Sequence, residues 1–481
     1  NTTATIKELA RLLPKTELHL HLDGSLSSEF IFKRAEARNI KLDVTKPEEL
    51  RPHLQQRKIK QIAGGNKQSA KGNWSIFDFC NRFLQTKEEL IDATADILYR
   101  CSRENVKVCE IRFCPSLHTL EGLTEKDAIK SVIDGYAKAQ EKVNIEGGVI
   151  VCALRSYPTE HSVEMAQLAS EFLDCTPGVV GYDIAGDEGS YPLSLMMDGI
   201  KEAKRLNVPV TVHAGEWPIE ERFKSSIDNL DIAVNSDCIK RIGHGIQLYK
   251  RDDLMKKVID NNIFVECCLT SNVGWKVKTY NEHPIKIMHE NGIKCSLNSD
   301  NFLLSGDSER EPSPTIEVLH LLQDVQLSID DLSKILCAGA ESCLPFTFHS
   351  RPMEGKRFYD NFKKSIGKSN VVGQSWQESK YSNANLDKMF ELYKKFLNKQ
   401  KPGIENKVVM DKEQFKIAAD NYTSRGRNAS QAFYFAKYMN LLFLETIGAN
   451  IRGPKLDELS RVIVRYAMSN TDISTFFIKV S

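Results

Sequence analysis

Histidines and an aspartate close several short apolar runs and could together hold a metal ion. His19 and His21 form a His-x-His pair at the end of one run, and His213, His244 and Asp300 end three others. Side chains at alternate strand positions point the same way, so both rings of the pair can reach one ion. Each histidine alone is as well explained by a structural role, but the group as a whole favours a metal site.

Glu216 follows this set in the segment His-Ala-Gly-Glu, three residues after His213. In a continued strand that offset would place the two side chains on opposite faces, but Gly215 can turn the chain. A carboxyl beside a metal and shielded from water is suited to general acid catalysis. The alternative is a solvated loop glutamate. We expect the turn to bring Glu216 to the same place as the histidines.

The runs that carry these residues are rich in Val and Ile and alternate with helical patterns. The eight candidate strands are 17–22, 106–113, 148–154, 179–184, 208–213, 241–246, 263–267 and 294–298. From the second onward there is room for a helix between each pair, which favours parallel strands with crossover helices. Eight such units predict an α/β fold of the (β/α)8 TIM-barrel type, with the active site at the carboxyl ends of the strands. A doubly wound sheet is the alternative, but no GxGxxG follows the first run.

Two further segments bear on the barrel. Between the first two strands, the polar segment 58–73 precedes an apolar helical pattern at 76–84. A loop over the barrel mouth with a covering helix and a surface insertion explain it equally well. After the last strand, 316–337 is expected to form one closing helix, and the barrel should finish near residue 350.

Five segments in order resemble the adenosine deaminase family of metal-dependent amidohydrolases. They are LPKTELHLHLDG at 13–24, GYDIAGDE at 181–188, VHAGE at 212–216, RIGHG at 241–245 and SLNSD at 296–300. The resemblance covers roughly residues 5–350. The H-x-E and P-C-x-x-C motifs of the other zinc deaminases are absent from the sequence.

The resemblance implies a zinc ion held by His19, His21, His213 and Asp300. Three histidines and a carboxylate suit zinc, although the ligands alone do not exclude another first-row metal. The bound metal would activate a water for attack on C6 of the purine. His244 would orient or deprotonate that water.

The resemblance also implies the contacts of the substrate. Glu216 would protonate N1 of the purine, Gly186 would offer a backbone contact to the base, and Asp23 would accept a hydrogen bond from the ribose 5′-hydroxyl. Many family members have a second aspartate after the metal ligand, in contact with N7, where this chain has Asn301. An amide can also donate to N7, so we expect Asn301 to bind substrate. The alternative is that Asn301 only shapes its loop.

The composition is that of a large globular protein. The chain has 481 residues, of which 41% are hydrophobic and 27% are charged. No uninterrupted apolar run of ~20 residues occurs, so no membrane span is predicted. The 12 cysteines include no CxxC and several lie in apolar runs. This usage favours free thiols in a reducing compartment, and we predict a cytoplasmic protein.

The charge is split along the chain. Residues 1–362 carry a net charge of −8 and residues 363–481 a net charge of +9. The latter segment matches nothing we associate with the family, and its patterns at 386–397 and 456–467 predict helices. Because no Arg/Lys stripe with interleaved aromatics appears, nucleic acid binding is not favoured. We predict a helical extension that packs on the barrel or on a protein partner.

The sequence therefore predicts two parts, a metal-dependent deaminase barrel at 5–350 and a helical C-terminal extension at 363–481. The predicted activity is zinc-dependent conversion of adenosine or 2′-deoxyadenosine to inosine or 2′-deoxyinosine plus ammonia. The predicted partner is a small purine nucleoside. The alternatives are a deaminase of adenine or of modified AMP, and a catalytically weak scaffold that uses the barrel as a rigid body.

Overall fold

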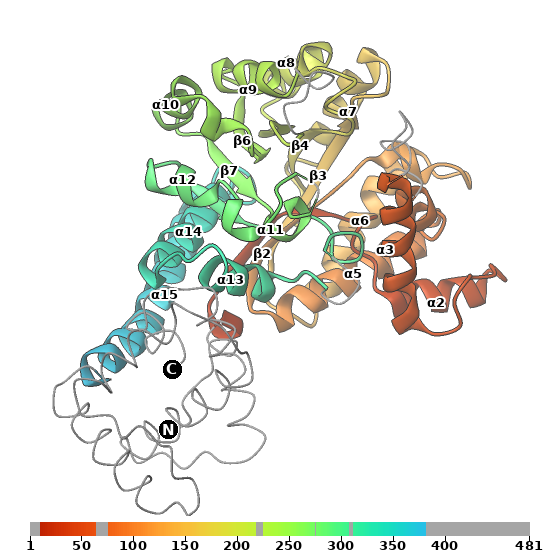
Figure 1. Ribbon diagram of the computed structural model, residues 1–481. Coiled ribbons are helices and arrows are strands. Elements are labelled where there is room, and N and C mark those ends of the chain that lie inside the picture. Colours follow the sequence, from red (N-terminus) through yellow and green to blue (C-terminus); the bar gives the residue numbers. More distant parts are fainter. Residues whose placement is uncertain (1–9, 64–75, 218–224, 275, 307–310, 381–481) are drawn as a thin grey trace, which may run out of the picture. The chain divides into compact units, whose positions relative to one another are not determined.

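A computed structural model describes residues 10–63, 76–217, 225–274, 276–306 and 311–380 (Figure 1). Its chain divides into two compact units. One consists of Pro14–His320 and Asp330–Lys364 and contains every strand and every predicted site residue. The other takes the remaining residues of the chain. The predicted helices at 386–397 and 456–467 lie outside the described residues.

Eight parallel strands form one sheet, in which each pairs with the next along the chain. The strands are β1 (Lys15–His21), β2 (Val106–Phe113), β3 (Glu146–Leu154), β4 (Val179–Ala185), β5 (Val210–Ala214), β6 (Ile239–His244), β7 (Phe264–Cys267) and β8 (Cys295–Leu297). The residues after β8 close the ring on β1, because Asp300 N–H donates to His19 O at 2.9 Å and His21 N–H donates to Asp300 O at 2.8 Å. The predicted (β/α)8 barrel is confirmed, with strand bounds within two residues of most predicted runs.

Helices follow the strands, and α6 to α10 lie around the outside of the barrel (Figure 1). The α-helices that follow the strands in turn are α6 (Glu125–Gln140), α7 (Thr159–Glu171), α8 (Met197–Arg205), α9 (Ser225–Asn235), α10 (Asp252–Asp260), α11 (Leu269–Asn272), α12 (Ile285–Glu290), α13 (Pro314–Gln323), α14 (Ile329–Ser342) and α15 (Pro352–Lys380). Short 3-10 turns lie at Pro115–His118, Leu193–Met196, Leu248–Lys250 and Tyr280–Glu282. Within this described part, no helix is long and apolar enough to cross a membrane.

The single closing helix predicted at 316–337 is wrong, because the structure has two helices there, α13 and α14. Gln326, in the segment between them, has a φ of +65°. That left-handed conformation is incompatible with a continuous right-handed helix. The residue type does not predict this break, since glutamine is a good helix former.

The long insertion between β1 and β2 holds α2 (Ser28–Ala37), α3 (Pro47–Ala63), a helical turn at 76–81 and α5 (Lys87–Arg103). A capping box between Thr86 and Glu89 starts α5. Arg51, on α3, donates to the carbonyls of Phe302 and Leu303 at 2.8 and 2.6 Å. These hydrogen bonds join α3 to the loop that follows Asp300, so α3 lies at the barrel mouth rather than on the outer surface. Residues 64–73 of the predicted loop lie outside the described residues.

Candidate active site

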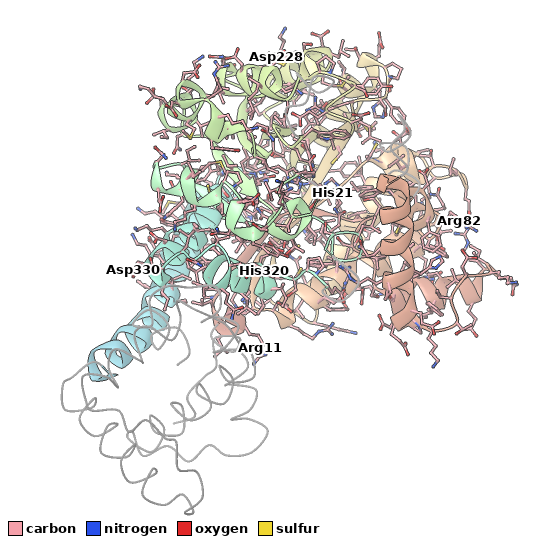
Figure 2. The ribbon with its side chains drawn as sticks, in the orientation of Figure 1. Arg11, His21, Arg82, Asp228, His320 and Asp330 are labelled. Carbon is pink, nitrogen blue, oxygen red and sulfur yellow. The ribbon has the colours of Figure 1, made fainter. Side chains whose placement is uncertain are left out.

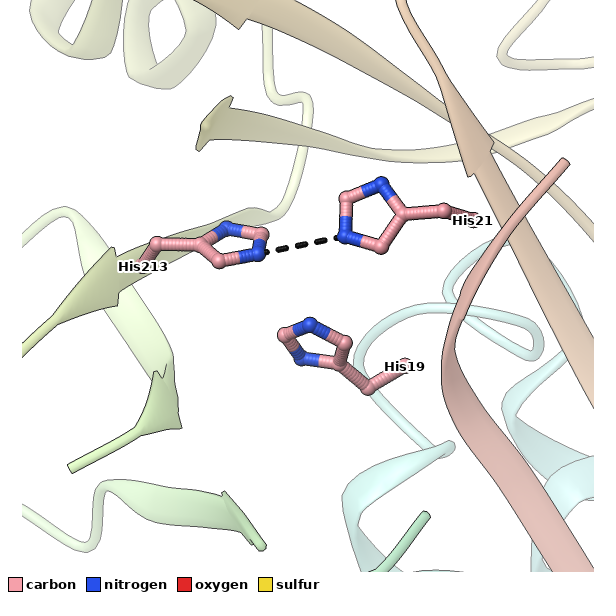
Figure 3. Close-up of side chains that lie close together, drawn as sticks. All are labelled: His19, His21 and His213. Carbon is pink, nitrogen blue, oxygen red and sulfur yellow. Dashed lines mark hydrogen bonds between the residues drawn. The ribbon is translucent and has the colours of Figure 1, made fainter. Parts of the chain in front are cut away.

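The predicted ligands converge at the carboxyl ends of the strands. The ring nitrogens of His19, His21 and His213 lie within 4.8 Å of one another (Figure 3). Asp300 Oδ1 is 3.7 Å from His19 Nε2 and 3.5 Å from His21 Nε2. Figure 2 shows His21 near the centre of the molecule, whereas Asp228, on α9, lies at its edge. The structure therefore brings together the four residues for which the sequence predicted a shared metal.

Buried carboxylates orient two of these rings. His19 Nδ1 lies 2.7 Å from Glu266 Oε2, and His213 Nδ1 lies 3.1 Å from Asp183 Oδ2. A neutral imidazole donates from the nitrogen that faces a carboxylate, so the lone pair of its other nitrogen is free to bind a metal. Burial lowers the pKa of His19 well below its ordinary value, which keeps the ring neutral.

The centre of the site fits a cation. His19 Nε2 is buried without a hydrogen-bond partner. His21 Nε2 and His213 Nε2 face each other at 3.2 Å, as the dashed line in Figure 3 marks. Burial alone would raise the pKa of Asp300, but His21, His244 and Lys276 lower it to about 2, so the carboxylate is charged. Three imidazoles and one carboxylate form a donor set that suits zinc.

Two guanidinium groups neutralise the carboxylates beneath the site. Arg112 pairs with Asp183 at 3.1 Å and with Glu266 at 2.8 Å. Arg241 pairs with Glu266 at 2.7 Å and with Glu110 at 2.6 Å. All five side chains are fully buried. Each carboxylate that orients a ligand is itself paired, as a buried charge must be.

Backbone strain marks the strand ends that carry the chemistry. His244 and Asp300 both have a φ of +64°, a backbone conformation that residues other than glycine seldom adopt. Such strain is found where the surrounding structure fixes a functional residue. Ser271, on α11, also donates to Asp300 Oδ2. The aspartate is thus held by its backbone and by its side chain.

Glu216 reaches the site through the predicted turn. Gly215 has a φ of +68°, and Glu216 lines the cavity with the histidines. The buried Glu188 accepts hydrogen bonds from the N–H groups of Gly215, Glu216 and Trp217 at 2.6, 2.9 and 3.2 Å. A carboxylate that binds three successive N–H groups fixes the direction of the turn. The side chain is therefore a positioned group rather than a solvated loop glutamate.

Two cationic or donor groups face the Glu216 carboxylate. His244 Nε2 lies 3.2 Å from Glu216 Oε1. Lys276, which the sequence analysis did not single out, contacts the same oxygen with its ammonium group. The side chain of Lys276 is only 5% exposed. A carboxylate, an imidazole and an ammonium group thus meet beside the metal ligands, where protons can be moved.

A cavity of about 310 Å³ joins these groups to the remaining predicted residues. Asp23, Gly186 and Asn301 line it together with His21 and Glu216. Part of its wall comes from the insertion, through residues 54–55, 76–78 and 81. The cavity continues well beyond the metal ligands, and its volume lies at the lower end of small-molecule sites.

The residues along this cavity differ in chemistry. Burial raises the pKa of Asp23 to about 7. Asn301 Oδ1 is buried without a hydrogen-bond partner. Gly186 has a φ of +104°, and because glycine has no side chain, its backbone faces the cavity directly. The cavity wall thus offers a carboxyl group, an amide and a bare stretch of backbone.

Comparison with known proteins identifies the family to which this chain belongs. The family model for adenosine deaminase matches residues 14–312. An adenosine deaminase from Clostridium acetobutylicum is 33% identical over 335 residues, which cover 69% of this chain and 94% of the relative. The chain belongs to the adenosine deaminase family. It is accordingly an enzyme of a metal-dependent hydrolase family.

Solved structures share the fold of this family member. An Arabidopsis N6-mAMP deaminase has a TM-score of 0.62 at 21% identity and covers 74% of this chain and 99% of its own. An adenine deaminase from Arthrobacter aurescens has a TM-score of 0.61 at 20% identity and covers 74% of this chain and 98% of its own. These likenesses support the barrel.

The residues that support the candidate ligands were not predicted from the sequence. Arg112, Asp183 and Glu266 each interrupt an apolar run, and a charge inside a buried strand must have a partner. That signal could have identified all three. Lys276 has no comparable signal, because its contact with Glu216 joins loops 60 residues apart.

Proposed function

We propose that this enzyme deaminates adenosine and 2′-deoxyadenosine, with zinc held by His19, His21, His213 and Asp300. Zinc would supply an activated water for attack on C6 of the purine. The proposal is supported chiefly by the convergence of the four candidate ligands beside one cavity, which Glu216 also lines. This arrangement occurs in a chain of the adenosine deaminase family.

The protein's own residues perform the remaining steps of this proposal. Glu216 delivers a proton to N1 of the purine, which makes C6 more electrophilic. His244 directs the attacking water. Asn301 and the backbone of Gly186 bind the base, and Asp23 accepts a hydrogen bond from the 5′-hydroxyl. Ammonia then leaves C6.

The walls of the cavity favour a nucleoside over the alternative substrates. Adenine alone would leave the buried Asp23 without a ribose partner. A phosphate would meet the carboxyls of Asp23 and Asp78, and Lys276 is the one Lys or Arg among the described residues that line the cavity. Since Lys276 already contacts Glu216, the described residues that line the cavity leave no cation for a 5′-phosphate. AMP and its modified forms are thus disfavoured.

The decisive experiment combines zinc analysis of the purified protein with an absorbance assay on adenosine, 2′-deoxyadenosine, adenine, AMP and N6-methyl-AMP. We expect one zinc per chain and turnover of the two nucleosides. Zinc-loaded, folded protein that turns over none of the five purines would support the scaffold alternative. His213→Ala should lose zinc and activity together, because three ligands hold the ion less tightly.

We further propose that the chemistry resides within residues 5–350 and that 363–481 serve as a helical extension that packs on the barrel or binds a protein partner. A chain ending at Phe362 should bind zinc and deaminate adenosine. If this truncation folds and binds zinc but is inactive, the extension completes the active site.

A further inference from the structure

A buried row of side chains leads from a backbone N–H group to His244. It begins at Ile285, the first residue of α12, whose N–H donates to His283 Nδ1 at 3.2 Å. Burial lowers the pKa of His283 to about 3, so its ring is neutral and has a single N–H. Because Nδ1 accepts a hydrogen bond, that proton lies on Nε2.

Asn272, at the end of α11, links the ring of His283 to the ring of His244 through its side-chain amide. Its Oδ1 lies 3.2 Å from His283 Nε2, and its Nδ2 lies 3.1 Å from His244 Nδ1. Turning the amide over would place its NH₂ group against the N–H of His283, so the backbone donor excludes that arrangement. The amide therefore donates to Nδ1 of His244.

The tautomer of His244 follows. A ring nitrogen that accepts a hydrogen bond carries no proton, so the proton of this ring lies on its other nitrogen. Its Nδ1 accepts from Asn272, which places its proton on Nε2, the nitrogen that lies 3.2 Å from Glu216 Oε1. The three side chains of the row are at most 2% exposed, so water does not compete for these hydrogen bonds.

We propose that Asn272 and His283 are positioning residues that hold His244 as its Nε2–H tautomer, so that His244 faces the reacting atoms as a hydrogen-bond donor. This inference rests on the proposed deaminase function and makes it more specific. A donor can orient the attacking water through the water's lone pair, but it cannot remove a proton with the same nitrogen. The proton of the water must therefore go to another group. Once Glu216 has given its own proton to N1, its carboxylate, 3.2 Å from His244 Nε2, can accept the proton of the water.

The proposal is tested by nitrogen NMR of the full chain, zinc-loaded and ¹⁵N-labelled at histidine. The signals of His244 among the 11 histidines are assigned from their loss in His244→Gln. We expect the wild type to carry the His244 proton on Nε2. The proton on Nδ1 in the wild type would overturn the proposal, whatever the activity.

Asn272→Asp is the informative variant because it reverses one hydrogen bond while it preserves shape. A carboxylate accepts from His283 Nε2–H and also from His244, which should move the proton of His244 to Nδ1. We expect kcat for adenosine to fall ~10–100-fold while KM changes little. Asn291→Asp makes the same change on an exposed side chain that bonds Ile287 O, and it should alter neither property.

Two changes at His283 keep the proposal testable if Asn272→Asp does not fold. His283→Gln can still donate to Asn272 and should retain the Nε2–H tautomer and most of kcat. His283→Leu cannot donate and should lose both. A switched tautomer with unchanged kcat, or equal activity in the Gln and Leu variants, would refute the positioning role. Absence of deaminase activity in a wild type with the expected tautomer would instead refute the proposed function.

Discussion

Gly243 lies on β6, beside His213 on β5, and leaves room for the ring of His19. A Cβ added there would be 2.8 Å from His19 Cε1 and 3.2 Å from its Nδ1. Non-bonded carbons prefer about 3.5–4.0 Å, so Gly243→Ala would have to move the ring by roughly 0.7 Å. The ring has little freedom to retreat, because Nδ1 is bound to Glu266 at 2.7 Å.

The size of the effect follows from the tolerance of metal sites. Ligand distances normally vary by about ±0.2 Å, so a shift of this size would distort the coordination. Loss of ligand orientation typically weakens metal binding ~10–100-fold, which corresponds to about 1.4–2.8 kcal/mol. We expect the variant to fold and to bind zinc more weakly by this factor. Competition with a chromophoric chelator would measure the change.

A matched control separates crowding from ligand displacement. Gly339, on α14, is also packed tightly, since an added Cβ would lie 2.5 Å from Thr16 Oγ1. Gly339→Ala should cost about 1–3 kcal/mol of stability, like other overpacked sites, and should leave zinc affinity unchanged. If folded Gly243→Ala binds zinc as tightly as the wild type, the close packing against His19 does not control the ligand, and the reasoning is wrong.

Three other outcomes are expected. Glu216→Gln should keep zinc and fold but lower kcat ~10²-fold or more, and near-normal turnover by the zinc-loaded variant would assign the acid elsewhere. In catalytic efficiency, adenosine should exceed AMP by at least ~10-fold, because the phosphate meets Asp23; equal or better efficiency with AMP would contradict the assigned 5′ subsite. Burial lowers the pKa of His118 to about 4, so the unfolded chain binds more protons between about pH 6.5 and 4. As the pH decreases from about 6.5 to about 4, the free energy of unfolding should therefore decrease by an amount on the order of 3 kcal/mol. His118→Gln should not show this decrease when its denaturation is measured at each pH.

The barrel and the convergence of the candidate ligands were predictable because they depend on local patterns. Short Val- and Ile-rich runs with helical spacers specify parallel strands, and parallel strands of a barrel end at one mouth. The alternation within β1 then points His19 and His21 the same way. Gly215 indicated the turn before Glu216, since a reversal of direction was needed and glycine permits it.

The supporting interactions were harder to predict because they depend on register across the barrel. Glu266 is 247 residues from His19, and Asn272 is 28 residues from His244. Only the closed sheet determines which inward-facing side chains meet. The break between α13 and α14 depends on one left-handed residue, Gln326, whose type gives no such signal.

The residues that orient the candidate ligands also form ion pairs in the barrel interior, so the proposed metal binding and folding share these interactions. Glu266 contacts His19 and bridges Arg112 and Arg241, while Asp183 contacts His213 and Arg112. Breaking a buried ion pair costs about 3–5 kcal/mol because the partner charge stays buried. A substitution at Glu266 would therefore reduce stability and metal affinity together. Activity lost in such a variant would say little about chemistry. Glu216→Gln removes only the contact with Lys276 and leaves the ion pairs of Glu266 and Asp183 intact, so it reports on the reaction itself.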